Sequence, residues 1–389
     1  MVVLRAPLAA DAQRAIPSSE RVAQAAGHVA GPLERAVAAG KRRAGVLIPL
    51  FSMRRRGDWG IGDIGAIAPF ANWSQKAGFS VLQLLPINAV SGLDASPYAA
   101  ISAFAIDPVY LALEDCEDFV AAGGRAALPP ALQTEIDALS RTPKVAWNRV
   151  RAVKREGSIL AFQRFLRDEW RPRTARAREL MSFMKEHRAW LDHYALFSTL
   201  HDEQQKSWLD WPLGLRDRTP DAIAEVRRHY EEPLLRKSWE QWQLDRQWRA
   251  ARHQAGSIGE PGVDLMGDLP FTVAMDSADV WSHRAIFRTD LRVGAPPDEL
   301  SSEGQDWGMP VYDWVALQRS DFAWLRARAA RAGELFSLYR IDHVIGFYRT
   351  FFRSDAGSTG FTPLDEGAQI RLGEMVMRLM CHFGEVVAE

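Results

Sequence analysis

Three carboxylates fall where a folded chain often carries its chemistry. Asp268, Asp342 and Glu389 each end a short apolar run of the kind that a buried parallel strand shows. In a β/α barrel the carboxyl ends of the strands form the rim on which catalytic groups sit. The three acids are therefore candidates for nucleophilic, acid–base or ligand-binding roles.

Arg340 adds a cation to this set. It lies two residues before Asp342, so on a strand both side chains project to the same side. A guanidinium beside a carboxylate favours the ionised acid, which is the form that a nucleophile needs. A structural Arg–Asp pair that stabilises a barrel interior would give the same pattern. The pattern alone favours neither interpretation.

Residues 60–65 match the G-x-G-x-x-G pattern of a dinucleotide-binding loop. Such a site needs glycines that turn directly off a strand and an acidic residue that ends the next strand. Here a separate loop lies between Leu50 and Gly60, and the next predicted strand ends at Asn88 without an acid. We expect glycines that allow close backbone approach, and no dinucleotide cofactor.

Two loops carry side chains that suit a sugar ligand. Tyr98 closes the segment Asp94-Ala-Ser-Pro-Tyr98, whose simplest role is a turn, although its ring could stack on a sugar. The stretch 293–310 predicts a long irregular connection, which in a compact domain is typical of a lid or a binding loop. The sequence has no zinc-ligand spacing, no phosphate loop and no G-x-S-x-G elbow.

Apolar runs and helical periodicity predict the elements that would position these residues. Buried parallel strands are expected at 46–50, 79–86, 263–271, 336–343 and 384–389, and helices at 66–77 and 370–382. The strand–helix–strand order implies right-handed crossovers. Residues 115–255 are expected to be mainly helical, and the segment 276–279 predicts a helix N-cap at Asp276 with Asp279 as an acid at the third helical position.

The composition limits the class of partner. Lys and Arg number 48 against 49 Asp and Glu, which gives no support to nucleic acid or a membrane surface, because both need a basic face. Fourteen tryptophans favour a sugar ligand, although those within 115–255 are expected mainly to pack helices. No run reaches the about 18–20 apolar residues of a membrane span, and the first 40 residues lack the apolar core of a secretory signal. Two cysteines are too few for a disulfide framework, so a cytoplasmic location is expected.

In their order and spacing, several segments resemble the amylomaltase, or 4-α-glucanotransferase (disproportionating enzyme), family of the α-amylase superfamily. The similarity runs from about Arg43 to Glu389. The segments that carry it are Gly57-Asp-Trp-Gly-Ile-Gly-Asp-Ile-Gly65, Ser96-Pro-Tyr98, Ser102-Ala-Phe104, Gly267-Asp-Leu-Pro270, Asp276-Ser-Ala-Asp-Val-Trp281, Pro296-Pro-Asp298, Gly304-Gln-Asp-Trp-Gly308 and Arg340-Ile-Asp-His343.

The resemblance implies a fold, a reaction and a set of roles. The fold would be an α/β (β/α)₈ TIM barrel with a large helical insertion, and the reaction a retaining transfer between α-1,4-glucan donors and acceptors without metal or cofactor. Asp342 would be the nucleophile, Glu389 the acid/base and Arg340 the group that keeps Asp342 ionised. The substrate-binding residues would be Asp268, His343, Tyr98, Ser96, Asp298, Gln305 and Trp307.

The resemblance also implies divisions of the chain. Residues 1–42 would be a peripheral extension, 43–114 the first part of the barrel, 115–255 the insertion, and 256–389 the barrel continuation as far as a fifth strand. The family's Asp-Leu-Gly after the acid/base and its later His-Asp-Asn segment are missing, so only about five barrel strands are expected and this chain should have little activity. An α-glucan hydrolase and a non-catalytic glucan-binding remnant are the alternatives.

Overall fold

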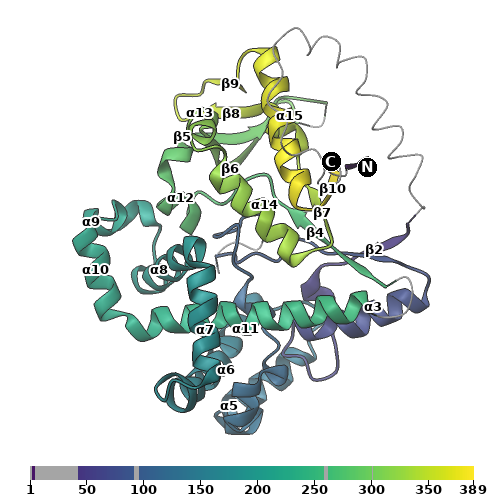
Figure 1. Cartoon of the computed structure of the whole chain (residues 1–389), viewed down its shortest axis with the longest axis vertical. Helices are drawn as coiled ribbons and strands as arrows, with labels where there is room; N and C mark the ends of the chain where they lie inside the picture. The colour runs from purple at the N-terminus through teal and green to yellow at the C-terminus, as the bar shows by residue number, and fades with distance from the viewer. Residues whose placement is uncertain (1, 5–42, 92–95, 258–261, 300) are drawn as a thin grey trace.

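A computed structural model describes residues 2–4, 43–91, 96–257, 262–299 and 301–389 (Figure 1). Most of the predicted extension, residues 1–42, therefore lies outside the described residues, as does Asp94. Within these ranges no helix is both long enough and apolar enough to cross a bilayer.

The strands that carry the candidate acids form one sheet. It contains β1 (Val2–Leu4), β2 (Gly45–Leu47), β3 (Val81–Gln83), β4 (Asp264–Leu269), β7 (Leu338–Ile341) and β10 (Glu385–Ala388). Its order is β1-β10-β7-β4-β3-β2, with β2, β3, β4, β7 and β10 parallel and β1 antiparallel to β10. The five parallel strands are confirmed, and in the described residues the sheet is open rather than closed into a barrel.

Two predicted helices flank this sheet with small changes. Helix α3 (Ile67–Lys76) joins β2 to β3 close to the expected bounds. Helix α15 (Glu366–Phe383) begins four residues before the expected start at 370, because Asp365 caps it by accepting the backbone N–H of Ala368 at 2.8 Å.

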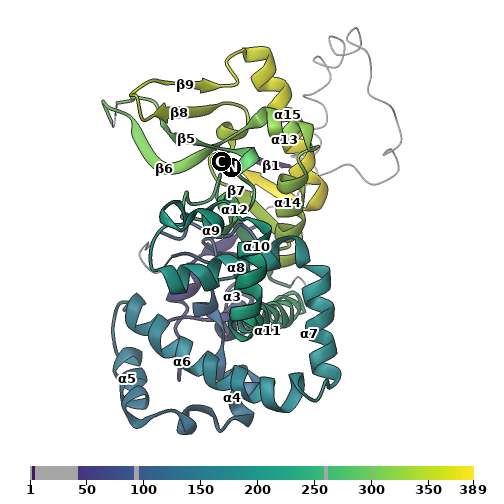
Figure 2. The same ribbon diagram turned by 90° about the vertical axis from the view of Figure 1, so that its left-hand side faces the viewer.

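Residues 117–256 are mainly helical. The helices are α4 (Glu117–Ala121), α5 (Pro130–Ser140), α6 (Trp147–Phe165), α7 (Ala175–Glu186), α8 (Arg188–Gln204), α9 (Leu213–Arg216), α10 (Pro220–His229) and α11 (Glu231–Gly256). Figure 2 shows them gathered at the opposite end of the molecule from β5, β6, β8 and β9. Trp190, Trp208, Trp211, Trp239, Trp242 and Trp248 are buried among them, as expected of residues that pack helices.

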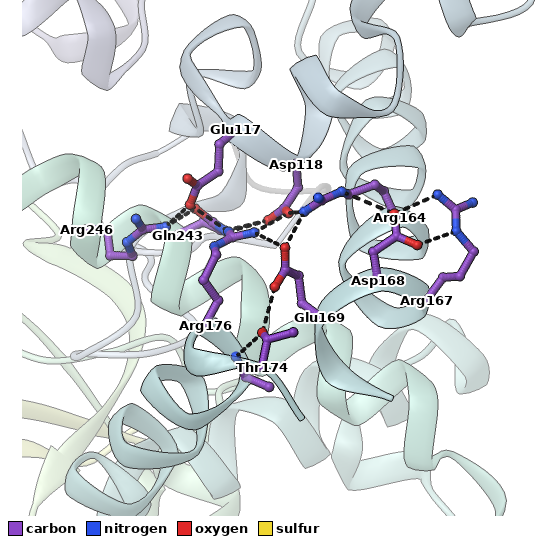
Figure 3. Close-up of polar contacts among 11 residues, drawn as sticks. Glu117, Asp118, Arg164, Arg167, Asp168, Glu169, Thr174, Arg176, Gln243 and Arg246 are labelled. Atoms are coloured by element: carbon purple, nitrogen blue, oxygen red, sulfur yellow. Dashed lines mark hydrogen bonds and ion pairs between the residues drawn. The ribbon is translucent and has the colours of Figure 1, made fainter. Parts of the chain in front are cut away.

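A network of ion pairs ties several of these helices together (Figure 3). Asp118 of α4 has a fully buried side chain, and it accepts hydrogen bonds from Arg164 at 2.8 Å, Arg176 at 2.6 Å and Gln243 at 3.0 Å. Because Arg164 lies on α6, Arg176 on α7 and Gln243 on α11, one carboxylate links four helices.

The expectation of an irregular stretch at 293–310 is wrong. A second, antiparallel sheet has the order β6-β5-β8-β9, formed by β5 (Phe287–Ala295), β6 (Gln305–Tyr312), β8 (Thr350–Ser354) and β9 (Thr359–Thr362). Only residues 296–304 connect β5 to β6. Position 294 must be glycine, because a side chain there would collide with the backbone of Gln305. Glycine is unfavourable inside a strand, so the sequence does not indicate that β5 pairs with β6.

The remaining helices are α12 (Ala278–Ser282), α13 (Trp314–Arg319) and α14 (Ala323–Leu335). The predicted cap of α12 is shifted by one residue. Ser277, not Asp276, is the N-cap and accepts the N–H of Val280 at 3.2 Å, which puts Asp279 at the second helical position. Asp279 is buried and accepts hydrogen bonds from the Ala103 N–H and the Trp324 indole.

Candidate active site

Arg340 is the centre of the candidate site. It lies on β7 between β4 and β10, with Asp268 of β4 and Val387 of β10 as its register partners. Its Nη1 donates to Asp268 at 2.5 Å and its Nη2 to Asp342 at 2.7 Å, and Nη2 also contacts Glu389. One guanidinium therefore joins the three acids that the sequence places at strand ends.

Backbone hydrogen bonds hold these strand ends together. The N–H of Asp342 donates to Leu269 at 3.0 Å, and the N–H of Val344 donates to Glu389 at 2.7 Å. The three acids differ in exposure, since the side chain of Asp268 is 1% exposed, that of Asp342 29% and that of Glu389 61%. Asp342 and Glu389 are therefore open to a ligand, whereas Asp268 lies behind them.

Tyr98 reaches the same group from a distant part of the sequence. Its hydroxyl donates to Asp268 at 2.8 Å, while the Ser96 hydroxyl accepts the Tyr98 backbone N–H at 3.3 Å within the turn. Burial and the neighbouring Asp268 raise the pKa of Tyr98, so the phenol stays protonated and remains a donor. Burial also raises the pKa of Asp268, although Arg340 and Tyr98 act in the opposite direction.

His343 and Trp307 form a second part of the site. Their ring centroids are 4.9 Å apart in an edge-to-face arrangement, and Trp307 donates its indole N–H to Gln305 at 2.9 Å. Burial lowers the pKa of His343, while Asp342 opposes that change. His343 has a left-handed backbone with φ of 50°, an uncommon conformation for a non-glycine residue that is often found at functional sites. The β6 strand therefore brings an indole to the end of β7.

Asp298 lies on the connection between β5 and β6. Its carboxylate accepts the N–H of Ser301 at 2.7 Å, which closes a local turn ahead of Gln305 and Trp307. The structure thus brings Asp268, Arg340, Asp342, Glu389 and Tyr98 directly together, pairs His343 with Trp307, and keeps Ser96, Asp298 and Gln305 on the segments that carry these side chains.

Comparison with known proteins identifies the family. The family model described as 4-alpha-glucanotransferase matches residues 48–366. The 4-alpha-glucanotransferase of Chlamydia pneumoniae is 31% identical over 343 residues, covering 86% of this chain and 61% of that protein. The chain belongs to the 4-alpha-glucanotransferase family. The Thermus thermophilus 4-alpha-glucanotransferase is 34% identical over 75% of this chain and 56% of its own length.

Solved members of the 4-alpha-glucanotransferase family share the fold. The amylomaltase from Streptococcus agalactiae in complex with acarbose has a TM-score of 0.74 and 24% identity, covering 90% of this chain and 69% of that one. The amylomaltase from Corynebacterium glutamicum has a TM-score of 0.69, also at 24% identity, covering 88% of this chain and 46% of that one. Compared with its chlamydial relative, this family member spans 61% of the length.

One supporting residue of this 4-alpha-glucanotransferase family member was missed from the sequence. Arg328 of α14 is 2% exposed and donates to the carbonyls of Pro270 at 2.5 Å and Phe271 at 3.0 Å. These bonds fix the segment that follows Asp268, and Phe271 packs edge-to-face on His343. In the sequence, Arg328 is one of several arginines in an Ala- and Arg-rich helix, so nothing singles it out.

Proposed function

We propose that this chain carries the glycosyl-transfer centre of a 4-alpha-glucanotransferase. It would move α-1,4-glucan segments between maltooligosaccharides or starch- and glycogen-type glucans, with glucose as a further acceptor. The observation that carries the proposal is the contact of Arg340 with three carboxylates at adjacent strand ends. A solved family member that holds acarbose supports this ligand class.

The proposed chemistry is a retaining double displacement. Two carboxyl groups about 5–5.5 Å apart divide such a reaction. Asp342 would attack the anomeric carbon to form a glycosyl-enzyme, and Glu389 would protonate the leaving oxygen and then accept a proton from the acceptor hydroxyl. Arg340 contacts both acids, so Glu389 would leave that ion pair when it carries the proton.

The other residues would bind the glucan. Asp268 and His343 would accept or donate hydrogen bonds to sugar hydroxyls, and Tyr98, held by the turn at Ser96, would provide a ring beside the cleaved bond. The segment with Asp298, Gln305 and Trp307 would cover the acceptor. Transfer would prevail over hydrolysis if a bound acceptor excludes water from the glycosyl-enzyme.

The five parallel strands would be the first five of a (β/α)₈ barrel in which 115–255 is an insertion between 43–114 and 256–389, with 1–42 peripheral apart from β1, which pairs with β10 at the edge of the sheet. Their sheet is open in the described residues, which leaves part of a barrel interior uncovered. We therefore expect the 389-residue chain to bind glucan with little turnover, in a cytoplasmic setting.

Incubation of the chain with maltotriose tests this function. Redistribution into glucose and longer oligosaccharides would support transfer, and glucose and maltose alone would indicate a hydrolase instead. Asp342→Asn should remove all residual redistribution, while calorimetric binding of maltotriose is retained. Robust turnover by Asp342→Asn would refute the nucleophile assignment. Failure of the unmodified chain to bind maltotriose would refute the glucan site.

A further inference from the structure

A cavity of about 250 Å³ lies among three helices of the 115–255 region. One face of α6, one of α8 and one of α11 line it, and residues 89–91 with Ile101 close one side. Helix α11 contacts both α6 and α8, and Figure 2 shows all three away from the second sheet. Five cations line the cavity, namely Arg151, Lys154, Arg155, Arg236 and Lys237.

Four of these cations already have a carboxylate. Lys237 pairs with Asp202 at 2.8 Å and Arg236 pairs with Glu240 at 2.6 Å, and both acids belong to the cavity lining. The other two pair with acids that do not line the cavity: Arg151 pairs with Asp107 at 2.7 Å, and Lys154 pairs with Asp63 at 2.9 Å. Four of the five cations that line the cavity therefore each have a carboxylate partner.

Arg155 is the exception. In the part of the chain that the structure describes, it has no ion-pair partner within 4.0 Å, although it lines the same cavity. Its positive charge acts on Asp202, which lines the same cavity. Burial alone would raise the pKa of Asp202, but Lys237 and Arg155 together help to lower that pKa below its ordinary value. Arg155 is thus an exposed guanidinium on the cavity lining that acts on Asp202 from a distance, and among the described residues it is the one cation of the lining that forms no ion pair.

We propose that this cavity binds a small phosphate-bearing ligand, either inorganic phosphate or a monosaccharide phosphate. A guanidinium offers two parallel N–H groups that match two phosphate oxygens. Lys237 and Arg236 lie close enough to share the added negative charge, since both line the same space. The apolar wall formed by Ile101, Pro108 and Val109 can face a sugar ring.

The cavity lies at the base of the segment that carries Tyr98. Val90 bridges to Ala100, and the N–H of Ile101 donates to Ala89 at 2.7 Å. Tyr98, beyond this base, holds Asp268 at 2.8 Å. A ligand in the cavity would therefore contact residues 89–91 and Ile101, from which the segment with Tyr98 extends. Binding of this ligand does not depend on the proposed transfer activity.

Calorimetric titration of the 389-residue chain with inorganic phosphate, glucose 1-phosphate and glucose, at equal ionic strength, tests the proposal. We expect saturable binding of both phosphate compounds that depends on Arg155, whereas any binding of glucose, which would occupy the proposed glucan site, should be the same in Arg155→Ala as in the unmodified chain. Arg155→Ala should weaken phosphate binding at least about tenfold, because a charge-assisted contact is lost. Equal affinity for both phosphate compounds would identify phosphate itself, and tighter binding of glucose 1-phosphate would identify a sugar phosphate.

Arg171→Ala is the matched control, because Arg171 is exposed, lies outside the cavity lining and likewise has no ion pair among the described residues. Its phosphate affinity should equal that of the unmodified chain. The proposal fails if neither phosphate compound binds saturably, if Arg155→Glu binds as tightly as the unmodified chain, or if Arg171→Ala weakens binding as much as Arg155→Ala. Maltotriose binding by Arg155→Ala should be unchanged, which separates this site from the glucan site.

Discussion

Two groups of charged residues in this chain differ in balance. At the ends of β4, β7 and β10, Arg340 is the one Arg or Lys of the described residues that forms ion pairs with Asp268, Asp342 and Glu389. In the helical region, four cations face four acids, namely Arg164, Arg167, Arg176 and Arg246 against Glu117, Asp118, Asp168 and Glu169 (Figure 3). Buried charges in a structural network are usually paired, whereas functional sites are where like charges are often held close together. The imbalance thus favours chemistry at the strand ends and support in the helices.

The largest effect on stability is expected in the helical network. Asp118→Asn keeps the shape of the side chain but leaves Arg164 and Arg176 without their buried carboxylate. We expect a loss of about 3–5 kcal/mol in the free energy of unfolding, the usual cost of removing one partner of a buried pair. Urea denaturation measures it.

Asp168→Asn is the control for that prediction. Asp168 belongs to the same network, but its side chain is 36% exposed and pairs with Arg167 near the surface. The expected loss is below about 1 kcal/mol. Equal losses for Asp118→Asn and Asp168→Asn would show that burial does not distinguish the members of this network.

Tryptophans sharpen the same contrast. Trp307 is half-buried beside His343, whereas Trp248 is fully buried and donates to the carbonyl of Leu335 at 2.6 Å. Trp307→Ala should weaken maltotriose binding about tenfold, because a stacking face for the sugar is lost, with little change in stability. Trp248→Ala should instead cost about 3–5 kcal/mol of stability. A Trp307→Ala protein that binds normally would exclude this indole from the glucan site.

Lowering the pH should destabilise the helical region through protonation of His193. Burial, with Arg218 as a neighbour that donates to Nδ1 at 3.1 Å, lowers the pKa of His193 to about 4. An unfolded histidine titrates near 6.5, so the unfolded chain binds this proton more strongly. The stabilising contribution is complete above pH 6.5 and is lost progressively as the pH falls toward 4.

Melting temperatures at pH 7.5 and pH 5.0 measure this effect. His193→Gln should show a smaller drop between the two values than the unmodified chain, and His229→Gln, which changes an exposed residue at the end of α10, should show the same drop as the unmodified chain. An unaltered drop in His193→Gln would assign the acid sensitivity to other groups.

The sequence predicts the strand ends better than the sheet beside them. Short apolar runs locate β4, β7 and β10, and a parallel order then brings Asp268, Arg340 and Asp342 together without further information. The β5–β6 pair is hidden because Gly294 and the prolines of 296–310 interrupt its alternation, and because pairing with β8 is a long-range property. The role of Arg328 is hidden for the same reason, since its partners Pro270 and Phe271 are distant in the sequence.

The smallest expected effect is the one that decides between the two interpretations of the Arg340–Asp342 pair. In the helical network, neutralising an acid leaves a surplus cation, so the chain is destabilised. At the strand ends, neutralising Asp342 leaves Arg340 with Asp268 and Glu389, which still exceed its charge. Asp342→Asn should therefore leave stability unchanged or raise it by up to about 1 kcal/mol, because repulsion between Asp342 and the buried Asp268 is removed.

Urea denaturation of Asp342→Asn and Asp118→Asn under the same conditions makes that comparison. If Asp342→Asn costs as much as Asp118→Asn, Asp342 is a counter-ion that Arg340 requires, and the pair is structural. If Asp118→Asn lowers the free energy of unfolding and Asp342→Asn raises it, while maltotriose binding persists in Asp342→Asn, the Asp342 carboxylate destabilises the fold at the position where it lies. A destabilising carboxylate is expected at an active site, because its negative charge is needed for the reaction and not for folding.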